Sequence, residues 1–395
     1  MDNNFTINRR LFSNSSRATA NDKNMAALDQ ITLKGFKSIR ELTDFRLDKL
    51  NVLVGANGAG KSNLVDFFRM LRAMADGGLQ SFVTNSGGGD GFFFNGPKET
   101  KQISAHLRFG SSQYRFSLEP TVSGEMTIRE EAIRYTSGRF PSDWQNSGGG
   151  KKESSLPSWK DRKSTWGDYL SAEAHVYKSV SSWMVYHVHD TSWTAPMRRD
   201  CSARDFRELR SDAGNVAAFL LKMQEENAAR YQRIRETIQM VAPFFDDFLL
   251  EPQMKGENEL VRLEWRQKGS SFPFQPWQFS DGTIRFICLA TALLQPKPPF
   301  TILIDEPELG LHPYALEVLV QLLKEAAQRT QLVVSTQSAP LLNQFEPQDV
   351  VVVERAEGAS HFRRLEAEPL ADWLKDYALG ELLQKNVIEA GPTHA

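Results

Sequence analysis

Short apolar runs along this chain are separated by segments in which apolar residues recur at helical spacing. The first run, residues 50–54, is almost continuously apolar, which is typical of a strand buried on both faces of a parallel sheet. A glycine-rich turn follows, and then an amphipathic pattern predicts a helix with one face packed on a sheet. The apolar positions of this helix are Leu64, Phe67, Phe68 and Leu71. Strand, loop and helix in this order predict an α/β fold.

Later segments repeat or vary this pattern. Residues 301–304 and 331–334 read as further buried strands, each followed by polar residues. Between residues 101 and 118, apolar residues alternate with polar ones, which predicts half-buried antiparallel strands. Helical spacing returns from residue 202 to about 245, but no long heptad array follows, so we expect no long coiled coil. Residues 147–155 are polar and glycine-rich and predict a long, flexible, exposed loop.

Composition places the chain among ordinary globular proteins. It has 395 residues, of which 41% are apolar and 24% charged, and a formal net charge of −2. This length allows one large core and an inserted second lobe. With only Cys201 and Cys288, a disulfide framework is not expected. No apolar run approaches the roughly 18 residues of a membrane span. We therefore expect a cytoplasmic protein without a membrane segment.

The glycine-rich turn at residues 55–62 has the composition and setting of a phosphate-binding loop. Glycines let successive backbone N–H groups point at phosphate oxygens, and the start of the following helix adds its positive end. Lys61 would reach the outer phosphates of ATP, and the Ser62 hydroxyl would bind Mg²⁺. The candidate nucleotide-binding residues here are Asn57, Gly58, Ala59, Gly60, Lys61, Ser62 and Asn63.

The strand at residues 301–304 ends in two adjacent carboxylates, Asp305 and Glu306. We expect Asp305 to bind Mg²⁺ directly or through water, and Glu306 to orient and deprotonate the attacking water. Alone, an ordinary strand that ends in a solvated Asp-Glu-Pro turn would be the commoner explanation. Because the chain also has the phosphate-binding loop, a nucleotide site is the better explanation of the two carboxylates.

Residues 279–286 precede an apolar helical stretch about twenty residues before the acidic strand. Ser280 is suited to cap this helix, and Gly282 leaves the backbone open to a ligand. Junctions of this kind favour an anion. The position resembles that of the signature segment of ABC-type ATPases.

In combination the motifs are similar to those of the SMC, RecF and OLD branch of ABC-type ATPases, and more narrowly to the predicted ATPases of bacterial and phage-defence loci. The matching segments are residues 31–39, 60–64, 280–283, 305–308 and 312–313, with weaker matches at 379–382 and 385–387. The implied fold is an ABC-type, RecF/SMC-like P-loop NTPase head of the α/β class. It would have a mixed or antiparallel β lobe and an inserted helical region.

Residues 1–27 are rich in Asn, Ser and Arg without apolar periodicity, which predicts a tail, and with the resemblance this gives four expected parts. These are a disordered tail (1–27), the N-terminal half of the ATPase head with the β lobe (28–135), an inserted helical and loop region (136–255), and the C-terminal half of the head (256–395).

The resemblance also implies how ATP acts. One subunit binds ATP, and the signature segment of another completes the site, so that Ser280 and Gly282 donate to the γ-phosphate across a homodimer or a larger homo-oligomer. A ligand held only by the dimer shifts the association equilibrium by mass action. ATP would therefore act as an association switch, which hydrolysis by Glu306 resets.

Two residues depart from the patterns of these families. Asp281 stands where ABC transporters have a second glycine, and we interpret it as a helix-capping residue turned away from the nucleotide. Gln337 stands where this branch usually has a histidine. Glutamine can donate a hydrogen bond to the γ-phosphate but carries no titrating proton, so slow hydrolysis is expected. We count Gln337 with Glu306 and Lys61 as candidate catalytic residues. The alternative is that Gln337 only caps the end of a strand.

Other clusters carry weaker signals. Two groups of basic residues make DNA a candidate partner. The net charge of −2, however, provides no overall electrostatic attraction to DNA. The groups are Arg198, Arg199, Arg204, Arg207 and Arg210, and Lys151, Lys152, Lys160, Arg162 and Lys163. His187, His189 and Asp190 lack further ligands at metal-site spacing, so a strand with alternating exposed histidines is the better interpretation.

Two classes of function follow. The first is an ATP-driven switch or scaffold in antiviral defence that controls a separate effector, such as a Toprim-like nuclease or another toxin. The alternative is a RecF-like repair ATPase whose dimer clamps DNA. A broader alternative is an ATP-binding assembly module in which hydrolysis is incidental. OLD-type relatives carry a Toprim domain after the ATPase, whereas only about forty residues follow Glu354, without an Asp-x-Asp pair. We therefore expect any nuclease to be a separate polypeptide.

Overall fold

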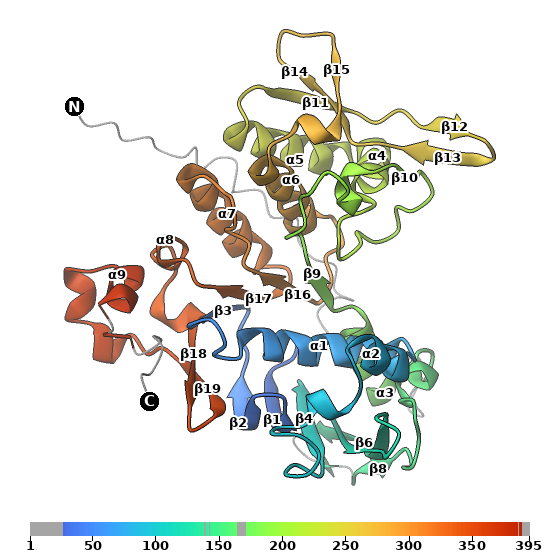
Figure 1. Cartoon of the computed structure of the whole chain (residues 1–395), viewed down its shortest axis with the longest axis vertical. Helices are drawn as coiled ribbons and strands as arrows, with labels where there is room; N and C mark the ends of the chain where they lie inside the picture. The colour runs from blue at the N-terminus through green and yellow to red at the C-terminus, as the bar shows by residue number, and fades with distance from the viewer. Residues whose placement is uncertain (1–26, 138–139, 142, 164–170, 386, 389–395) are drawn as a thin grey trace.

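Two β-sheets with a helix between them form the centre of the molecule (Figure 1). The computed structural model describes residues 27–137, 140–141, 143–163, 171–385 and 387–388. Most of the predicted N-terminal tail lies outside these residues. The first sheet has six strands in the order β19-β18-β3-β17-β16-β9, all parallel except β19. Its strands are β3 (Leu50–Val54), β9 (Met184–Tyr186), β16 (Thr301–Asp305), β17 (Gln331–Thr336), β18 (Val350–Ala356) and β19 (Ala359–Arg364).

Both faces of the parallel sheet are buried, as the continuous apolar runs predict. Side chains alternate between the faces, so Val52 and Val54 join one hydrophobic core while Leu53 joins another. The same alternation separates Ile302 and Ile304 from Leu303. The parallel sheet is therefore the middle layer of the molecule.

The second sheet is antiparallel and forms the β lobe, in the order β2-β1-β4-β5-β6-β7, with β8 also paired to β6. The alternation predicted for residues 101–118 is confirmed here: Ile103, Leu107 and Phe109 are buried. The strands are β1 (Gln30–Phe36), β2 (Ile39–Arg46), β4 (Ile103–Phe109), β5 (Ser112–Pro120), β6 (Met126–Ser137), β7 (Phe140–Pro141) and β8 (Gln145–Asn146).

Helix α1 (Lys61–Ala75) lies between the two sheets, and Figure 1 shows it crossing beneath the parallel strands. Its predicted apolar face is fully buried in the core shared with the β lobe. Two shorter helices, α2 (Leu79–Asn85) and α3 (Ala172–Ser181), flank this layer.

Helices cover the other face of the parallel sheet, where α6 packs against α5 and α7. They are α4 (Val216–Glu226), α5 (Ala228–Val241), α6 (Asp281–Leu294) and α7 (Pro313–Ala326). Two short helices, α8 (Ala339–Leu342) and α9 (Leu379–Gln384), pack against each other, with α9 at the left of Figure 1. The helical pattern predicted from residue 202 thus begins only at Val216. Residues 203–215 form turns and bends, where the Asn215 side chain bonds the carbonyls of Asp205 and Glu208.

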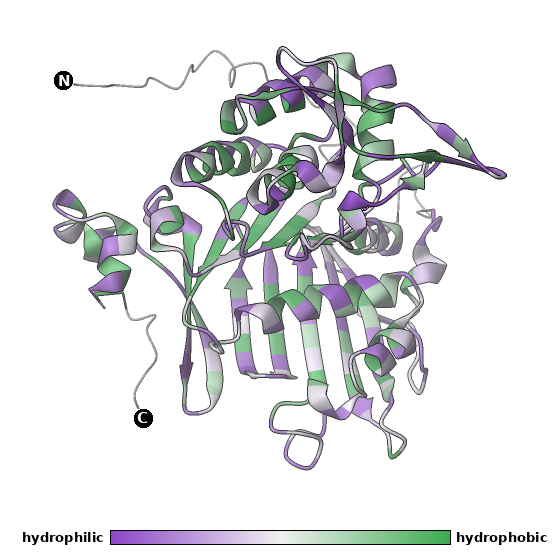
Figure 2. Cartoon of the chain, turned by 45° about the horizontal axis from the view of Figure 1, so that its top comes forward, coloured by the Kyte–Doolittle hydropathy of each residue, from purple (hydrophilic) through white to green (hydrophobic). Residues whose placement is uncertain are grey.

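Two small antiparallel sheets stand beyond α4 and α5 at the top of Figure 1. One contains β10 (Cys201–Ser202), β12 (Gln253–Lys255) and β13 (Asn258–Val261), and the other β11 (Phe245–Leu249), β14 (Glu264–Gln267) and β15 (Pro273–Phe274). Figure 2 shows that the projecting tip of the β12–β13 hairpin is hydrophilic. The 3-10 turns are η3 (Asp90–Phe92), η4 (Leu156–Trp159), η5 (Pro196–Arg198), η6 (Pro276–Gln278), η7 (Pro347–Asp349), η8 (Glu368–Leu370) and η9 (Trp373–Lys375).

Residues 147–155 form a loop in which residues 148–152 are exposed, as predicted, but the segment is held against the β lobe. This segment lies along β6: the Ser147 N–H donates to Glu131 O at 2.7 Å, and the Ile128 N–H donates to Lys151 O at 2.8 Å. A Cβ on Gly149 would lie 2.0 Å from Arg129 O, so the backbone approaches β6 as closely as only glycine allows. Glycine was read as a sign of flexibility, but here it permits close packing.

The two cysteines are buried and free, as the composition predicts. Among the described residues, none of the helices combines the length and hydrophobicity that a membrane crossing requires.

Candidate nucleotide-binding site

The glycine-rich loop begins where β3 ends, between the two parallel neighbours β17 and β18. Gly58 and Gly60 have φ angles of 79° and 112°, in the left-handed region that favours glycine. Within the described part of the chain, no hydrogen bond engages the N–H groups of Gly58, Gly60 or Ser62. Asn57 is exposed at the tip of the loop. These free donors at the start of α1 suit a phosphate group.

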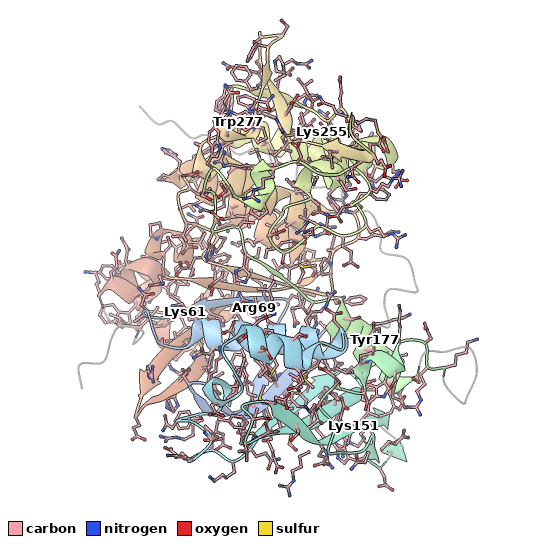
Figure 3. All side chains as sticks on the ribbon, turned by 45° about the vertical axis from the view of Figure 1, so that its right-hand side comes forward. Lys61, Arg69, Lys151, Tyr177, Lys255 and Trp277 are labelled. Carbon is pink, nitrogen blue, oxygen red and sulfur yellow. The ribbon has the colours of Figure 1, made fainter. Side chains whose placement is uncertain are left out.

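Lys61 lies at the first position of α1, where Figure 3 places it between the parallel sheet and the β lobe. Its ammonium group donates to the carbonyls of Gly55 at 2.6 Å and Ala56 at 3.1 Å, within its own loop. Burial lowers the pKa of Lys61, and three carboxylates oppose this shift. They are Glu306, Asp305 and Glu308. A cation held by loop carbonyls beside free N–H groups is chemically fitted to an anionic ligand.

A chain of hydrogen bonds holds the closing turn of the loop. Asn63 Nδ2 donates to Ser38 Oγ at 2.5 Å, Ser38 Oγ lies 2.6 Å from Ser360 Oγ, and Ser360 donates to Ala59 O at 2.5 Å. Because Ser360 donates to a carbonyl, Ser38 must be the donor between the two hydroxyls. A Cβ on Gly60 would lie 2.0 Å from Ser360 Oγ. The side chain of Asn63, a candidate nucleotide ligand, is thus engaged with the β lobe.

Ser360→Ala removes the hydroxyl that donates to Ala59 O and accepts from Ser38. We expect ATP binding to weaken about fivefold, because loss of the bond to Ala59 costs about 1 kcal/mol and frees the Ala59 turn. The turnover number should change little, since the Ser360 hydroxyl bonds the loop and Ser38 but none of the candidate catalytic side chains. Titration calorimetry measures the affinity, and exposed Ser123→Ala is the matched control. An unchanged dissociation constant would show that the loop keeps its shape without Ser360.

Asp305, the last residue of β16, and Glu306, which follows it, lie at the same edge of the sheet as the loop. Asp305 accepts a hydrogen bond from the Ser335 hydroxyl of the neighbouring strand β17. Glu306 has a φ angle of 40°, which is strained for a residue with a side chain, and its N–H donates to Ser335 O at 2.9 Å. The Gln337 amide donates to the Glu306 carboxylate. The structure thus brings together the three predicted catalytic residues, Lys61, Glu306 and Gln337.

The predicted Mg²⁺ ligands are Ser62, exposed in the first turn of α1, and Asp305. Hydroxyl and carboxylate oxygens are the donors that Mg²⁺ prefers. Among the described residues, no group of three His, Cys, Asp or Glu side chains is arranged to hold a metal ion. The donor set fits an ion that takes its other ligands from phosphate and water.

The signature segment opens helix α6. The Ser280 hydroxyl accepts from the Thr283 N–H at 3.2 Å, so Ser280 is the N-cap, as predicted. A Cβ on Gly282 would lie 2.3 Å from Gly310 O, so this glycine permits contact with the loop that follows the acidic strand. Among the described residues, no hydrogen bond joins Ser280 or Gly282 to the glycine-rich loop of the same chain.

Arg285 of α6 ties the signature segment to two neighbouring loops. Its guanidinium donates to Val188 O and His189 O, both at 3.0 Å, and to Leu309 O. Burial lowers the pKa of Arg285, and the Asp281 charge opposes this shift. The start of α6 is therefore fixed to the exits of β9 and β16.

Asp281 does not cap α6 as predicted, because Ser280 occupies that position. Asp281 is the first helical residue, and its carboxylate accepts from the Arg198 guanidinium at 2.9 Å. The Arg198 side chain is only 4% exposed, whereas that of Asp281 is 68% exposed. The aspartate is therefore a partner for a buried arginine.

Arg198 also donates to three backbone carbonyls: Thr191 O at 2.9 Å, Pro276 O at 2.7 Å and Phe279 O at 3.1 Å. It is thus a structural residue behind the signature segment and is not available to DNA. Four other arginines of its sequence cluster are exposed, on turns and bends outside any α-helix. They are Arg199, Arg204, Arg207 and Arg210.

The histidines after β9 are not exposed strand residues, which corrects the prediction. His187 and His189 follow the end of the strand and are half-buried. His189 Nε2 donates to Asp305 O at 2.7 Å. His187 Nδ1 lies 3.2 Å from Arg69 Nη2, and burial together with the Arg69 charge lowers the pKa of His187 to about 4. Both histidines thus stand beside the acidic strand.

Sequence reasoning missed four residues that shape this site: Ser38, Ser360, Arg198 and Arg285. The motif around Ser38 was noticed, but not its contact with a strand more than 300 residues away. Only Arg285 carried a local signal, since a charged residue in an otherwise apolar helix calls for a buried partner.

Comparisons with known proteins identify a family and solved structures of the same fold. A family model described as "AAA domain, putative AbiEii toxin, Type IV TA system" matches residues 50–343. A solved SMC head bound to the C-winged helix domain of ScpA superimposes with a TM-score of 0.57 at 16% identity, covering 88% of this chain and 99% of that one. An SMC head with an extended coiled coil, bound to the C-terminal domain of ScpA derived from Pyrococcus furiosus, gives 0.54 at 15% identity, with 89% and 99% covered. No curated protein matches the chain.

Proposed function

We propose that this chain, which belongs to the AAA-domain family described above and has the fold of an SMC head, is an ABC-type ATPase of the SMC/RecF branch that binds and hydrolyses Mg-ATP as a dimerisation switch. The observation that supports hydrolysis is the meeting of Lys61, Glu306 and Gln337 at one edge of the parallel sheet. The proposed nucleotide ligands are the loop residues Asn57 to Asn63, completed by Ser280 and Gly282 of a second copy.

In the proposed reaction, a water oxygen attacks the γ-phosphorus, the bond to the β-phosphate oxygen breaks, and Glu306 accepts the proton. The Gln337 amide orients the Glu306 carboxylate. Lys61 moves from the loop carbonyls to the phosphates and offsets their growing charge. Mg²⁺ bound by Ser62 and Asp305 would supply further charge neutralisation. Because Gln337 cannot relay a proton, we expect slow turnover.

The association switch rests on the signature segment. Ser280 is exposed, and Arg198 and Arg285 hold the backbone around it in place. This rigid donor surface has no bond to the phosphate loop of its own chain, so a second copy is the partner that suits it.

Mixing two inactive variants tests whether the site is shared. Lys61→Ala removes the phosphate contact, and Ser280→Arg blocks the signature surface. Each variant alone should be inactive, whereas their mixture should regain hydrolysis, because each mixed dimer contains one intact site. Melting curves check that both variants fold, since loss of the Ser280 cap costs about 1 kcal/mol. A mixture that stays inactive while wild type hydrolyses ATP would show that the site lies within one chain.

We propose that this switch acts in the cytoplasm in antiviral defence and restrains a separate effector, such as a Toprim-like nuclease or toxin. The family description, which refers to a toxin of a toxin–antitoxin system, supports this class. In this proposal residues 28–135 and 256–395 form most of the head. The insertion at residues 136–255 also contributes β9 to the parallel sheet and β8 to the β lobe, and its remainder is available to partners. Copurification of the effector with ATP-bound protein, and its release after hydrolysis, is the expected result.

The alternative is a RecF-like ATPase that clamps DNA. The exposed arginines at 199, 204, 207 and 210 favour it. Stimulation of ATP hydrolysis by duplex DNA, lost when these arginines are replaced by glutamine, would support the DNA function over the defence function.

A further inference from the structure

A third carboxylate, Glu308, stands beside the two that the sequence assigns to catalysis. It follows Asp305 by three residues and is half-buried. One carboxylate oxygen, Oε1, accepts hydrogen bonds from the Thr336 hydroxyl at 2.5 Å and from the Gln337 N–H at 3.3 Å. The other, Oε2, is buried and has no hydrogen-bond partner among the described residues. Glu308 therefore joins the end of β16 to the end of β17.

The contacts of Glu308 continue into the turn that carries Gln337. The Thr336 oxygen accepts from the Ser338 N–H at 2.9 Å while its hydroxyl proton points at Glu308. Ser338 is the N-cap of α8. The backbone of residues 336–338 is thus held from both sides, and the Gln337 side chain leaves this turn to reach Glu306.

The negative charge of Glu308 is costly where it stands. Burial raises the pKa of Glu308, because the charged form loses its hydration. A buried carboxylate oxygen without a donor is a cost that a neutral side chain would avoid. A purely structural link between two strands would need no such charge.

We propose that Glu308 is a positioning residue for ATP hydrolysis, which holds the Gln337 turn so that the Gln337 amide stays on the Glu306 carboxylate. This inference rests on the proposed ATPase function. Glu308 itself accepts no proton from water. It acts through the Thr336 hydroxyl and the Gln337 backbone N–H, both of which donate to its carboxylate.

Glu308→Gln keeps an oxygen acceptor of the same shape but removes the charge. We expect the turnover number to fall about tenfold, the loss associated with one charge-assisted hydrogen bond. The dissociation constant for a non-hydrolysable ATP analogue should change less than about threefold, because Glu308 makes no contact with the phosphate loop. Exposed Glu317→Gln on α7 is the matched control and should leave both quantities unchanged.

Variants at Thr336 test the same contact if Glu308→Gln does not fold. Thr336→Val removes the hydroxyl at nearly constant shape and should slow turnover as Glu308→Gln does. Thr336→Ser restores the hydroxyl and should recover most of the rate, which a packing role for the methyl group would not predict. Turnover within about twofold of wild type in both Glu308→Gln and Thr336→Val overturns the inference, given the tenfold loss expected for one such bond.

Failure of the proposed ATPase function would give a different result from failure of the positioning role of Glu308. If wild type neither binds nor hydrolyses Mg-ATP, the ATPase function is wrong, and Glu308 loses its proposed role with it. If wild type hydrolyses ATP and only the Glu308 and Thr336 variants are unaffected, the ATPase function stands and the positioning role is wrong.

Discussion

Glu306→Gln is expected to lower ATP turnover at least about a hundredfold, because an amide at this position cannot accept the proton of the attacking water. Binding of ATP should persist, since the phosphate loop and Lys61 are untouched. The Gln337 amide can still donate to the oxygen of the new side chain, so the local geometry should survive. The variant should therefore accumulate an ATP-dependent dimer or larger species, which light scattering with and without Mg-ATP measures.

The control for this variant is Glu317→Gln, which makes the same chemical change at an exposed position on α7. It should hydrolyse ATP as wild type does and show no accumulated dimer. If the mass of Glu306→Gln is the same with and without Mg-ATP and its turnover equals that of wild type, the proposed catalytic role of Glu306 is wrong. The chain would then be a preassembled scaffold in which hydrolysis is incidental.

Arg198→Met should destabilise the fold by about 3 kcal/mol, because three buried carbonyls would each lose a donor worth about 1 kcal/mol. The carbonyls belong to Thr191, Pro276 and Phe279. Loss of the Asp281 contact should add little, since that carboxylate is largely exposed and can be hydrated. Urea unfolding of the nucleotide-free protein measures the change.

Arg199→Met is the matched control, because the neighbouring arginine is exposed and has no ion pair among the described residues. It should change the unfolding free energy by no more than about 0.5 kcal/mol. Equal destabilisation by the two substitutions would contradict the structural role of Arg198. If only Arg199→Met reduces DNA-stimulated hydrolysis, the two arginines have separate roles that their adjacency in sequence conceals.

The phosphate-binding loop and the strand before it were predictable because their signals are local. The loop needs glycines at positions with left-handed φ angles, a preceding buried strand and a following amphipathic helix, all within residues 50–75. The same holds for Ser280, whose capping bond reaches only to Thr283. Local hydrogen bonds and helical periodicity depend on neighbours that the sequence displays side by side.

Contacts between distant segments could not be predicted in this way. The histidines at 187 and 189 resembled exposed strand residues, because nothing local shows that β9 ends there beside β16. The arginines at 198 and 199 looked equivalent, yet one is buried and the other exposed. The glycines at 148–150 indicated flexibility, whereas Gly149 allows the segment to lie against β6.

By itself, the sequence determined that this protein has buried parallel strands, a phosphate-binding loop and an acidic strand end, since each follows from the order of residues in one short segment. Only the tertiary structure decided which groups meet there. Parallel strands deliver their carboxyl ends to one edge whatever their order along the chain, so Lys61, Glu306 and Gln337 converge although the chain separates them by up to 276 residues (337 − 61). The roles of Ser360, Arg198 and Glu308 depend on this convergence, because a buried polar group is defined by partners that only folding supplies.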